Sequence, residues 1–318
     1  MPSLKFLARR LTDRTFGTAF DRALARARGD SSNRFLFFWN RGLGDIALGL
    51  VPLFLRIRAE VRGARIEVIT RDELRAPFEL TAVDAIHSIP GLRRETRVDI
   101  ARACETLGMD PGQFAALFDY PDPNRWLADR REEFPPRLAW NPAWDALAER
   151  FETIPRARRV IGAHVNSETA RHYGYLKDWP AESWQALFTR FAEAGDVHWV
   201  LFGRGPEPRF AGDRTTDLRG QTSFPELMSV IKNRCGVLVA PDSGVLTMAY
   251  YLDAAFPIEV ISLWSDPRQG ILLQGCPSPN PLLRHTPLLS PAEDVRNLSL
   301  DTVDAALRKT GDRPLVPP

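Results

Sequence analysis

The first clear pattern along the chain is a continuous run of apolar residues from Phe35 to Trp39. A run of this length without alternation predicts a strand buried on both faces, as in a parallel sheet. A glycine-rich turn, residues 41–45, follows at once. Apolar spacing then predicts a helix from about Ile46 to Glu60 and a second strand from Ile66 to Ile69. Strand, helix and strand in this order predict a βαβ unit.

The same alternation begins again in the second half of the chain. Strands are predicted over Arg159–Ala163, His198–Phe202, Val237–Ala240 and Ile258–Leu263, and helices over Ala181–Ala194, Phe224–Lys232 and from Val245 onward. Two such blocks predict an α/β protein with two doubly wound, Rossmann-like domains. A basic stretch containing proline separates the blocks near residues 153–158, so we place the domains at 33–155 and 156–318. Residues 111–142, rich in Pro, Trp and Asp, give no clear pattern.

Residues 1–32 precede the first predicted strand and form a basic N-terminal extension. Leu4, Leu7 and Leu11 share one stripe, and Phe20 and Leu24 share another, which predicts one or two amphipathic helices with an arginine-rich face. Two interpretations stay open for this segment. It is either a helix packed on the body of the protein or a peripheral contact with an anionic membrane, made through residues 1–30.

Composition narrows the class of protein. With 318 residues, 44% of them hydrophobic, the chain is too long and too apolar to be a disordered segment. The formal net charge of +2 gives no reason to expect nucleic acid as a partner. Three cysteines far apart in the sequence favour a reducing compartment, and the longest apolar run, Ile46–Leu55, is too short to span a bilayer. We therefore expect a soluble, cytoplasmic protein.

Three segments carry candidate chemistry, because ligands bind beyond the carboxyl ends of the strands in open α/β sheets. The first is Gly44-Asp45, directly after the first predicted strand. A carboxylate there can act as a general base, a role worth about 10²–10⁴ in rate. It can equally be an ordinary N-cap of the following helix, for which Asp is a preferred residue.

The other two segments suit an anion. Asp242-Ser243-Gly244 follows a strand and opens a helix at Val245, so its backbone amides can bind a pyrophosphate; the alternative is a capped helix after a tight turn. Asn166-Ser167 follows another strand, and Lys177 comes a few residues later, just before a helix that begins with Pro180. Lys177 can reach the same anion, or it is a solvated surface lysine.

Together the segments resemble glycosyltransferase family 9, the ADP-heptose:lipopolysaccharide heptosyltransferases and their relatives, from about Asn33 to Leu307. The resemblance rests on Gly42-Leu43-Gly44-Asp45 with Pro52, on Lys177-x-Trp179-Pro180 with Trp184, on Asp217-Leu218-x-Gly220, and on Thr222-Ser223-Phe224-x-Glu226-Leu227 ahead of Asp242-Ser243-Gly244. The ordered set is far more specific than any one of its members.

The resemblance implies a GT-B fold, in which two Rossmann-like domains face a central cleft and the N-terminal one holds the acceptor. It implies an inverting glycosyltransferase that moves a heptose or similar sugar, without a metal or other cofactor. The donor would be ADP-activated or carry another nucleoside diphosphate, with ADP-heptose favoured. The acceptor would be a lipopolysaccharide-core-like or other glycan. An acceptor on a lipid would place the basic extension on the inner face of the cytoplasmic membrane.

Matching positions give each residue an expected role. Asp45 corresponds to the catalytic base and Lys177 to the phosphate-binding lysine, and the Ser243 and Gly244 amides correspond to those that hold the pyrophosphate. Asn166 and Ser167 would be further phosphate contacts, and Glu207 would contact the ribose. The remaining residues expected on the donor side are Gly44, Asp242, Val245 and Thr247.

Two departures from the family pattern leave alternatives open. The family usually has a histidine where this chain has Thr247, and the stretch from Thr169 to Leu176 is longer than usual. His172, in that stretch, is a candidate replacement for the missing imidazole. The alternative functions are a nucleotide-sugar epimerase-like enzyme, which would turn over donor without acceptor, and a catalytically retired nucleotide-sugar-binding protein.

Overall fold

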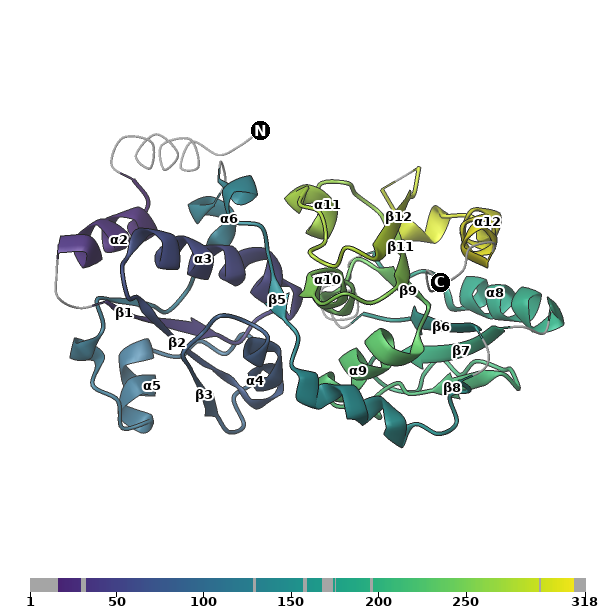
Figure 1. Ribbon diagram of the computed structural model, residues 1–318, viewed down its shortest axis with the longest axis horizontal. Helices are drawn as coiled ribbons and strands as arrows, with labels where there is room; N and C mark the ends of the chain where they lie inside the picture. The colour runs from purple at the N-terminus through teal and green to yellow at the C-terminus, as the bar shows by residue number, and fades with distance from the viewer. Residues whose placement is uncertain are drawn as a thin grey trace. The chain divides into compact units, whose positions relative to one another are not determined.

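The computed structural model describes residues 17–29, 33–127, 130–156, 159–167, 174, 176–194, 197–291 and 293–311. Among these the chain forms two compact units (Figure 1). The first contains the described residues up to Arg41 and from Asp45 to Pro136, and the second contains Gly42–Gly44 and the described residues from Arg137 onward. Each unit is built on its own parallel sheet.

The first unit holds a four-stranded sheet in the order β3-β2-β1-β4. Its strands are β1 (Arg34–Trp39), β2 (Arg65–Arg71), β3 (Ala85–Ile89) and β4 (Ala116–Phe118), and its α-helices are α2 (Ala19–Gly29), α3 (Val51–Glu60), α4 (Asp72–Glu79), α5 (Ile100–Thr106) and α6 (Pro123–Trp126). The apolar run of β1 is buried on both faces, as predicted. Phe37 packs edge-on against Phe54 of α3, whereas Leu36 and Phe38 join a cluster with α5.

The helix predicted over 46–60 is present. Its first part is a π-helical turn, η1 (Ile46–Leu50), which continues directly into α3. Pro52 has no amide to bond the carbonyl four residues earlier, which removes one bond of a regular α-helix. Gly49 lies in the same turn. A Cβ at this position would lie 2.7 Å from Cγ of Pro123, so a larger residue would not fit without a shift.

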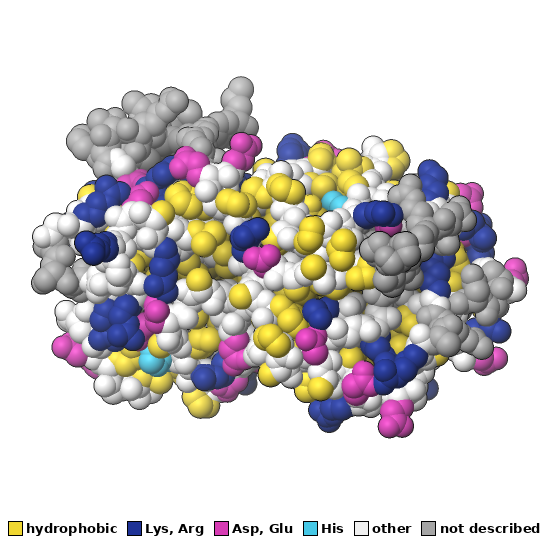
Figure 2. Space-filling model, viewed as in Figure 1, with side chains coloured by type: hydrophobic (Ala, Val, Ile, Leu, Met, Phe, Trp, Pro, Cys, Tyr) yellow, Lys and Arg dark blue, Asp and Glu magenta, His cyan; other side chains and the backbone are white. Residues whose placement is uncertain are grey.

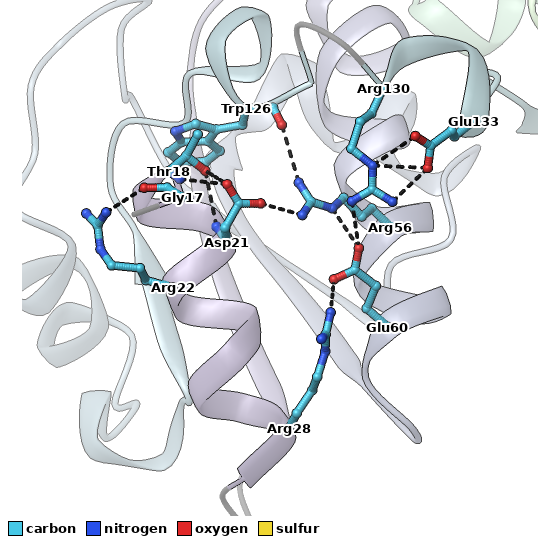
Figure 3. Close-up of polar contacts among 10 residues, drawn as sticks. All are labelled: Gly17, Thr18, Asp21, Arg22, Arg28, Arg56, Glu60, Trp126, Arg130 and Glu133. Atoms are coloured by element: carbon cyan, nitrogen blue, oxygen red, sulfur yellow. Dashed lines mark hydrogen bonds and ion pairs between the residues drawn. The ribbon is translucent and has the colours of Figure 1, made fainter. Parts of the chain in front are cut away.

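Helix α2 packs on the first unit through its apolar face. Phe20 and Leu24 are fully buried, and the Phe20 ring stacks on Trp126 with 5.3 Å between centroids. Arg56 of α3 then joins the elements (Figure 3): it forms an ion pair with Asp21 of α2, and its Nε donates to Glu60 Oε1 at 2.8 Å. For residues 19–29 the structure therefore agrees with packing on the body of the protein; residues 1–16 lie outside the described residues.

The second unit holds a six-stranded sheet in the order β12-β11-β9-β6-β7-β8, all parallel. Its strands are β6 (Arg159–His164), β7 (Val197–Phe202), β8 (Thr215–Asp217), β9 (Val237–Pro241), β11 (Ile258–Trp264) and β12 (Leu283–Leu289), and its α-helices are α8 (Ala181–Ala194), α9 (Phe224–Arg234), α10 (Gly244–Tyr250), α11 (Gly270–Gln274) and α12 (Leu300–Gly311). Trp179 and Trp184 are buried in a core that α8 and α12 share with the central strands. The strands and helices predicted in this half are all present.

The change of unit lies at Pro136, ahead of the boundary expected from the sequence at 155/156. Strand β5 (Leu138–Ala139) pairs in parallel with β10 (Leu252–Asp253). The 3₁₀ segment η4 (Pro142–Arg150) packs on α9, where the Ala148 amide donates to Ser229 Oγ at 3.0 Å. These contacts attach residues 138–150 to the second unit rather than to the first.

The rest of the stretch that gave no clear pattern consists of short pieces. It contains η2 (Pro111–Gln113), β4, α6 and η3 (Arg131–Glu133), of which none exceeds four residues. Such pieces are too short for a hydrophobic period to show in the sequence. On the molecular face shown in Figure 2, basic side chains are interspersed with acidic ones, consistent with the small net charge.

Candidate functional site

The carboxyl ends of β6, β7, β9 and β11 carry most of the residues predicted to bind the donor. These four strands are neighbours in the second sheet, with β9 between β11 and β6, and β7 beside β6. Because the strands are parallel, the segments that follow them emerge at one edge. Asn166-Ser167, Glu207 and Asp242-Ser243-Gly244 all lie in such segments.

Lys177 and Asp242 form an ion pair at this edge. The Lys177 side chain is 16% exposed and the Asp242 side chain 11% exposed, so the ammonium is not that of a solvated surface lysine. The Asp242 amide donates to Leu263 O at 3.2 Å, which fixes the end of β9 against β11. The structure thus places a cation directly beside the Asp242-Ser243-Gly244 segment.

Ser243 caps α10 with its side chain. Its Oγ accepts a hydrogen bond from the Leu246 amide at 3.2 Å, and its carbonyl accepts one from Thr247 Oγ1 at 3.1 Å. Thr247 is 2% exposed and its hydroxyl is committed to this backbone bond. The Thr247 hydroxyl therefore helps to hold the first turn of α10 by bonding the Ser243 carbonyl.

The segment Gly42–Gly44 approaches the start of α10 within the second unit. A Cβ on Gly244 would lie 2.9 Å from the Gly44 amide nitrogen, and a Cβ on Gly44 would lie 3.3 Å from Thr247 Oγ1. Glycine is required where two backbones come this close. Gly44, Gly244 and Thr247, which were predicted to share a site, are therefore brought together.

Asn166 and Ser167 are both held by protein atoms. The Ser167 amide donates to Asp178 Oδ1 at 2.9 Å. Burial raises the pKa of Asp178, and the hydrogen bonds from Ser167 offset only part of this rise. Asn166 Oδ1 accepts from the Arg204 amide at 3.0 Å, and its Nδ2 donates to the Glu207 carbonyl at 3.3 Å. The Glu207 side chain itself is 71% exposed. His172 lies outside the described residues.

Sequence reasoning missed two residues of this edge. Gly270, after β11, has φ +49°, and a Cβ there would lie 2.5 Å from Asp242 Oδ1, so the loop closes directly on the carboxylate. His164 ends β6 and is 5% exposed, and burial lowers its pKa to about 4. Its Nδ1 has no hydrogen-bond partner among the described residues. A histidine that ends a buried strand was the available signal.

Asp45 belongs to the first unit and directly follows the Gly42–Gly44 segment. It stands at the N-cap position of η1, but its backbone is helical, with φ −69° and ψ −16°, and its carboxylate makes no capping hydrogen bond. Asp45 therefore stands at the N-cap position that the alternative interpretation expected, without the side-chain bond of a capping Asp. The residue is exposed.

Two searches of the described residues bear on cofactors and membranes. In that part of the chain no cluster of three or more His, Cys, Asp or Glu side chains is arranged to hold a metal ion. None of the described helices combines the length and the apolar character needed to cross a bilayer.

Comparisons with known proteins were made by sequence and by structure. The profile of glycosyltransferase family 9 (heptosyltransferase) matches residues 133–269. No curated protein matches the chain by sequence. A family 9 glycosyl transferase from Veillonella parvula DSM 2008 is 14% identical, with 87% of this chain and 97% of that chain covered and a TM-score of 0.61.

Two heptosyltransferase structures are also similar. The ADP-heptose lipopolysaccharide heptosyltransferase II of E. coli is 17% identical, covers 87% of this chain and 98% of its own, and gives a TM-score of 0.56. TibC of enterotoxigenic E. coli, described as a dodecameric iron-containing heptosyltransferase in complex with ADP-D-β-D-heptose, is 12% identical, covers 89% and 77%, and gives 0.51. Likeness at these identities shows the fold, and the predicted GT-B class of two Rossmann-like units is confirmed. The match of the family 9 profile to residues 133–269, together with the shared fold, agrees with the resemblance carried by the motifs and supports glycosyltransferase activity.

Proposed function

We propose that this protein is an inverting glycosyltransferase that moves a heptose or similar sugar from a nucleoside diphosphate donor to a glycan acceptor. The observation that carries the proposal is the partly buried ammonium of Lys177 beside Asp242-Ser243-Gly244. The family match over 133–269 supports the reaction class. ADP is the favoured nucleotide, because structures similar to this one are described as ADP-heptose enzymes.

The donor pyrophosphate would bind at the edge of the second sheet. Lys177 supplies a positive charge, and the backbone amides of Ser243 and Gly244 supply donors suited to phosphate oxygens. Asp242 balances the charge of Lys177 in an ion pair. An arriving diphosphate would share the ammonium with Asp242, and Gly44, Val245 and Thr247 would close the backbone around it.

Asp45 would act as the base. Its carboxylate accepts the proton of the acceptor hydroxyl while the hydroxyl oxygen forms a bond to the anomeric carbon of the sugar. The bond from that carbon to the β-phosphate oxygen breaks, and the electron pair leaves with the nucleoside diphosphate. Attack on the face opposite the leaving group inverts the anomeric centre. The charge that develops on the leaving group falls beside Lys177, where a preorganised donor lowers the barrier.

No metal ion enters this proposal, since Lys177 and the amides can carry the phosphate charge. One similar structure is described as iron-containing, so the role of metal needs its own measurement. The acceptor is proposed to be a lipopolysaccharide-core-like or other glycan. A glycolipid acceptor would bring the protein to the inner face of the cytoplasmic membrane, where residues 1–30 can contact anionic lipid.

The experiment is a transfer assay with ADP-heptose and heptose-deficient lipopolysaccharide core, in the presence and absence of EDTA. Wild-type protein is expected to release ADP and to add one heptose to the acceptor, with EDTA making no difference. Asp45→Asn is expected to lower the rate by about 10²–10⁴ and to leave ADP affinity unchanged. Asp110→Asn is the control, because Asp110 is an exposed carboxylate before β4, at the opposite edge of the first sheet.

Three outcomes would contradict the proposal in different ways. Donor turnover without acceptor would indicate the epimerase-like alternative. Donor binding without transfer to any glycan would indicate a retired enzyme, for which the replacement of histidine by Thr247 is the motivating observation. An Asp45→Asn variant with wild-type rate would remove Asp45 as the base.

A further inference from the structure

The turn after β7, residues 203–208, lies largely at the surface, yet two side chains from other segments hydrogen-bond its backbone. Gly203 begins it with φ +147°, a backbone conformation that favours glycine, and the Gly203 carbonyl accepts a hydrogen bond from the Gly220 amide at 3.0 Å. A Cβ on Gly203 would overlap Oδ1 of Asn166. The turn is therefore shaped around the Asn166 side chain.

Asn166 holds the turn from the side of β6. Its Oδ1 accepts from the Arg204 amide at 3.0 Å, and its Nδ2 donates to the Glu207 carbonyl at 3.3 Å. One amide group thus bonds both ends of the turn. These two bonds use Oδ1 and one of the two N–H groups of Nδ2.

Arg219 also bonds the backbone of this turn. Its side chain is completely buried, with Nη1 donating to the Pro208 carbonyl at 2.7 Å and Nη2 to the Pro206 carbonyl at 2.8 Å. Asp217 balances the charge through bonds of 2.9 and 2.6 Å. Burying a guanidinium is costly unless all its partners are in place, so the turn and Arg219 fix one another.

The fixed turn presents one carboxylate to solvent, that of Glu207, which is 71% exposed. The turn ends β7, and β7 lies one strand from β6 and two from β9, whose end carries Asp242. In nucleotide-binding α/β folds, a carboxylate at the end of a strand near the phosphate site hydrogen-bonds the ribose hydroxyls. A carboxylate can select for a ribose only if its backbone is held at a set distance from the phosphate.

We propose that Asn166 and Arg219 are positioning residues for ribose recognition: they hold the 203–208 turn so that Glu207 meets the hydroxyls of the donor nucleoside. Asn166 on this account acts through the turn and not on the phosphate. The inference rests on the proposed function, because it requires a nucleoside diphosphate at the edge of the second sheet. The proposal adds two residues that would help the protein to select a ribose.

The test is isothermal titration with ADP and with 2′,3′-dideoxy-ADP, which keeps the base and the diphosphate and lacks both hydroxyls. Wild-type protein is expected to prefer ADP by about tenfold or more, since bonds to a charged group are at stake. Asn166→Ala is expected to remove most of this preference by weakening ADP, with dideoxy-ADP affinity unchanged. Gly203→Ala, which displaces Asn166 from the other direction, is expected to do the same.

Gln185→Ala is the matched control. Gln185 of α8 also bonds a backbone through both atoms of its amide, at Ala211, just beyond the turn. Its loss is expected to leave the preference for ADP intact. Arg219→Lys keeps the positive charge but cannot donate to both the Pro206 and the Pro208 carbonyl. With folding checked by circular dichroism, this variant is expected to reduce the preference for ADP as Asn166→Ala does.

The possible results distinguish failure of the positioning role from failure of the proposed function. If wild-type protein binds neither nucleotide, the proposed function fails and the inference with it. If Asn166→Ala weakens both nucleotides equally, Asn166 is a phosphate contact and the positioning role is overturned while the donor site stands. An unchanged preference for ADP in Asn166→Ala and Gly203→Ala overturns the inference too.

Discussion

Lys177 and Asp242, which are 65 positions apart in the sequence, meet as an ion pair at the end of β9. Removing the lysine takes away the charge that the donor phosphate needs. We expect Lys177→Ala to weaken ADP binding by about tenfold or more, as is usual for a hydrogen bond to a charged group. The measurement is titration calorimetry without metal.

Lys232→Ala is the control for this change. Lys232 is another partly buried lysine of the second unit, paired with Asp145 at 2.7 Å and 14% exposed. Its loss is expected to leave ADP affinity unchanged. Equal ADP affinity in wild-type protein and Lys177→Ala would rule out Lys177 as a phosphate contact.

Gly270 supports the same pair through its lack of a side chain. A Cβ at Gly270 would press on Asp242 Oδ1, whereas one at Gly275, at the other end of α11, would meet nothing within 4 Å. Both glycines have positive φ, so alanine strains the backbone at both positions. We expect both variants to lose stability in urea denaturation, and only Gly270→Ala to weaken ADP binding as well. Equal ADP affinity in the two variants would contradict the placement of the loop.

Acid is expected to destabilise the protein through its buried histidines. Burial lowers the pKa of His164 and of His285 to about 4, from an ordinary value of 6.5. The unfolded chain therefore binds more protons between these values, and stability is lost as pH falls from about 6.5 to about 4. The fully buried His164 contributes about 2 kcal/mol to the loss between pH 7 and pH 5, and the partly buried His285 contributes less.

The measurement is urea denaturation of wild-type protein and His164→Asn at pH 8, 7 and 5. The variant is expected to lose less stability than wild type between pH 7 and 5, and the same amount between pH 8 and 7. Carboxylates titrate in both proteins, so the difference isolates the histidine. Identical pH dependence in the two proteins would show that His164 is not held neutral by burial.

Helix α2 is expected to act as part of the first unit's core. Phe20 is fully buried against Trp126 and Phe118, so Phe20→Ala should lower the free energy of unfolding by about 3–5 kcal/mol. Arg26→Ala, on the exposed face of the same helix, should change it by less than about 0.5 kcal/mol. If Phe20 instead contacted membrane, Phe20→Ala would weaken vesicle binding and leave stability unchanged.

The sequence was sufficient for the elements with long apolar patterns. The run from Phe35 to Trp39 identified β1 because both faces of that strand are buried, and the alternation after Arg159 identified the second sheet. The π-helical form of residues 46–50 was not predicted, because a single π-helical turn leaves no period of its own in the apolar pattern. Strand β5 was missed because its two residues are defined only by pairing with β10.

The candidate site was predicted to a similar extent. Local motifs indicated Lys177 and Asp242-Ser243-Gly244, whose chemistry is visible in a few consecutive residues. Gly270 was missed because its role depends on the Asp242 side chain, which comes near it only in the fold. The proposed role of Arg219 depends in the same way on the backbone carbonyls of Pro206 and Pro208. Asn166 was identified as a site residue, but the bonds of its amide to the 203–208 turn could not be read from its position in the sequence.

Binding of a nucleoside diphosphate by the second unit can be measured with a thermal-shift panel of ADP, GDP, UDP, CDP and dTDP in EDTA. A ligand at 100 times its Kd stabilises a protein by about 2.7 kcal/mol, which moves the unfolding midpoint visibly. We predict a clear upward shift with ADP, absent in Lys177→Ala. No shift with any of the five nucleotides would contradict the account.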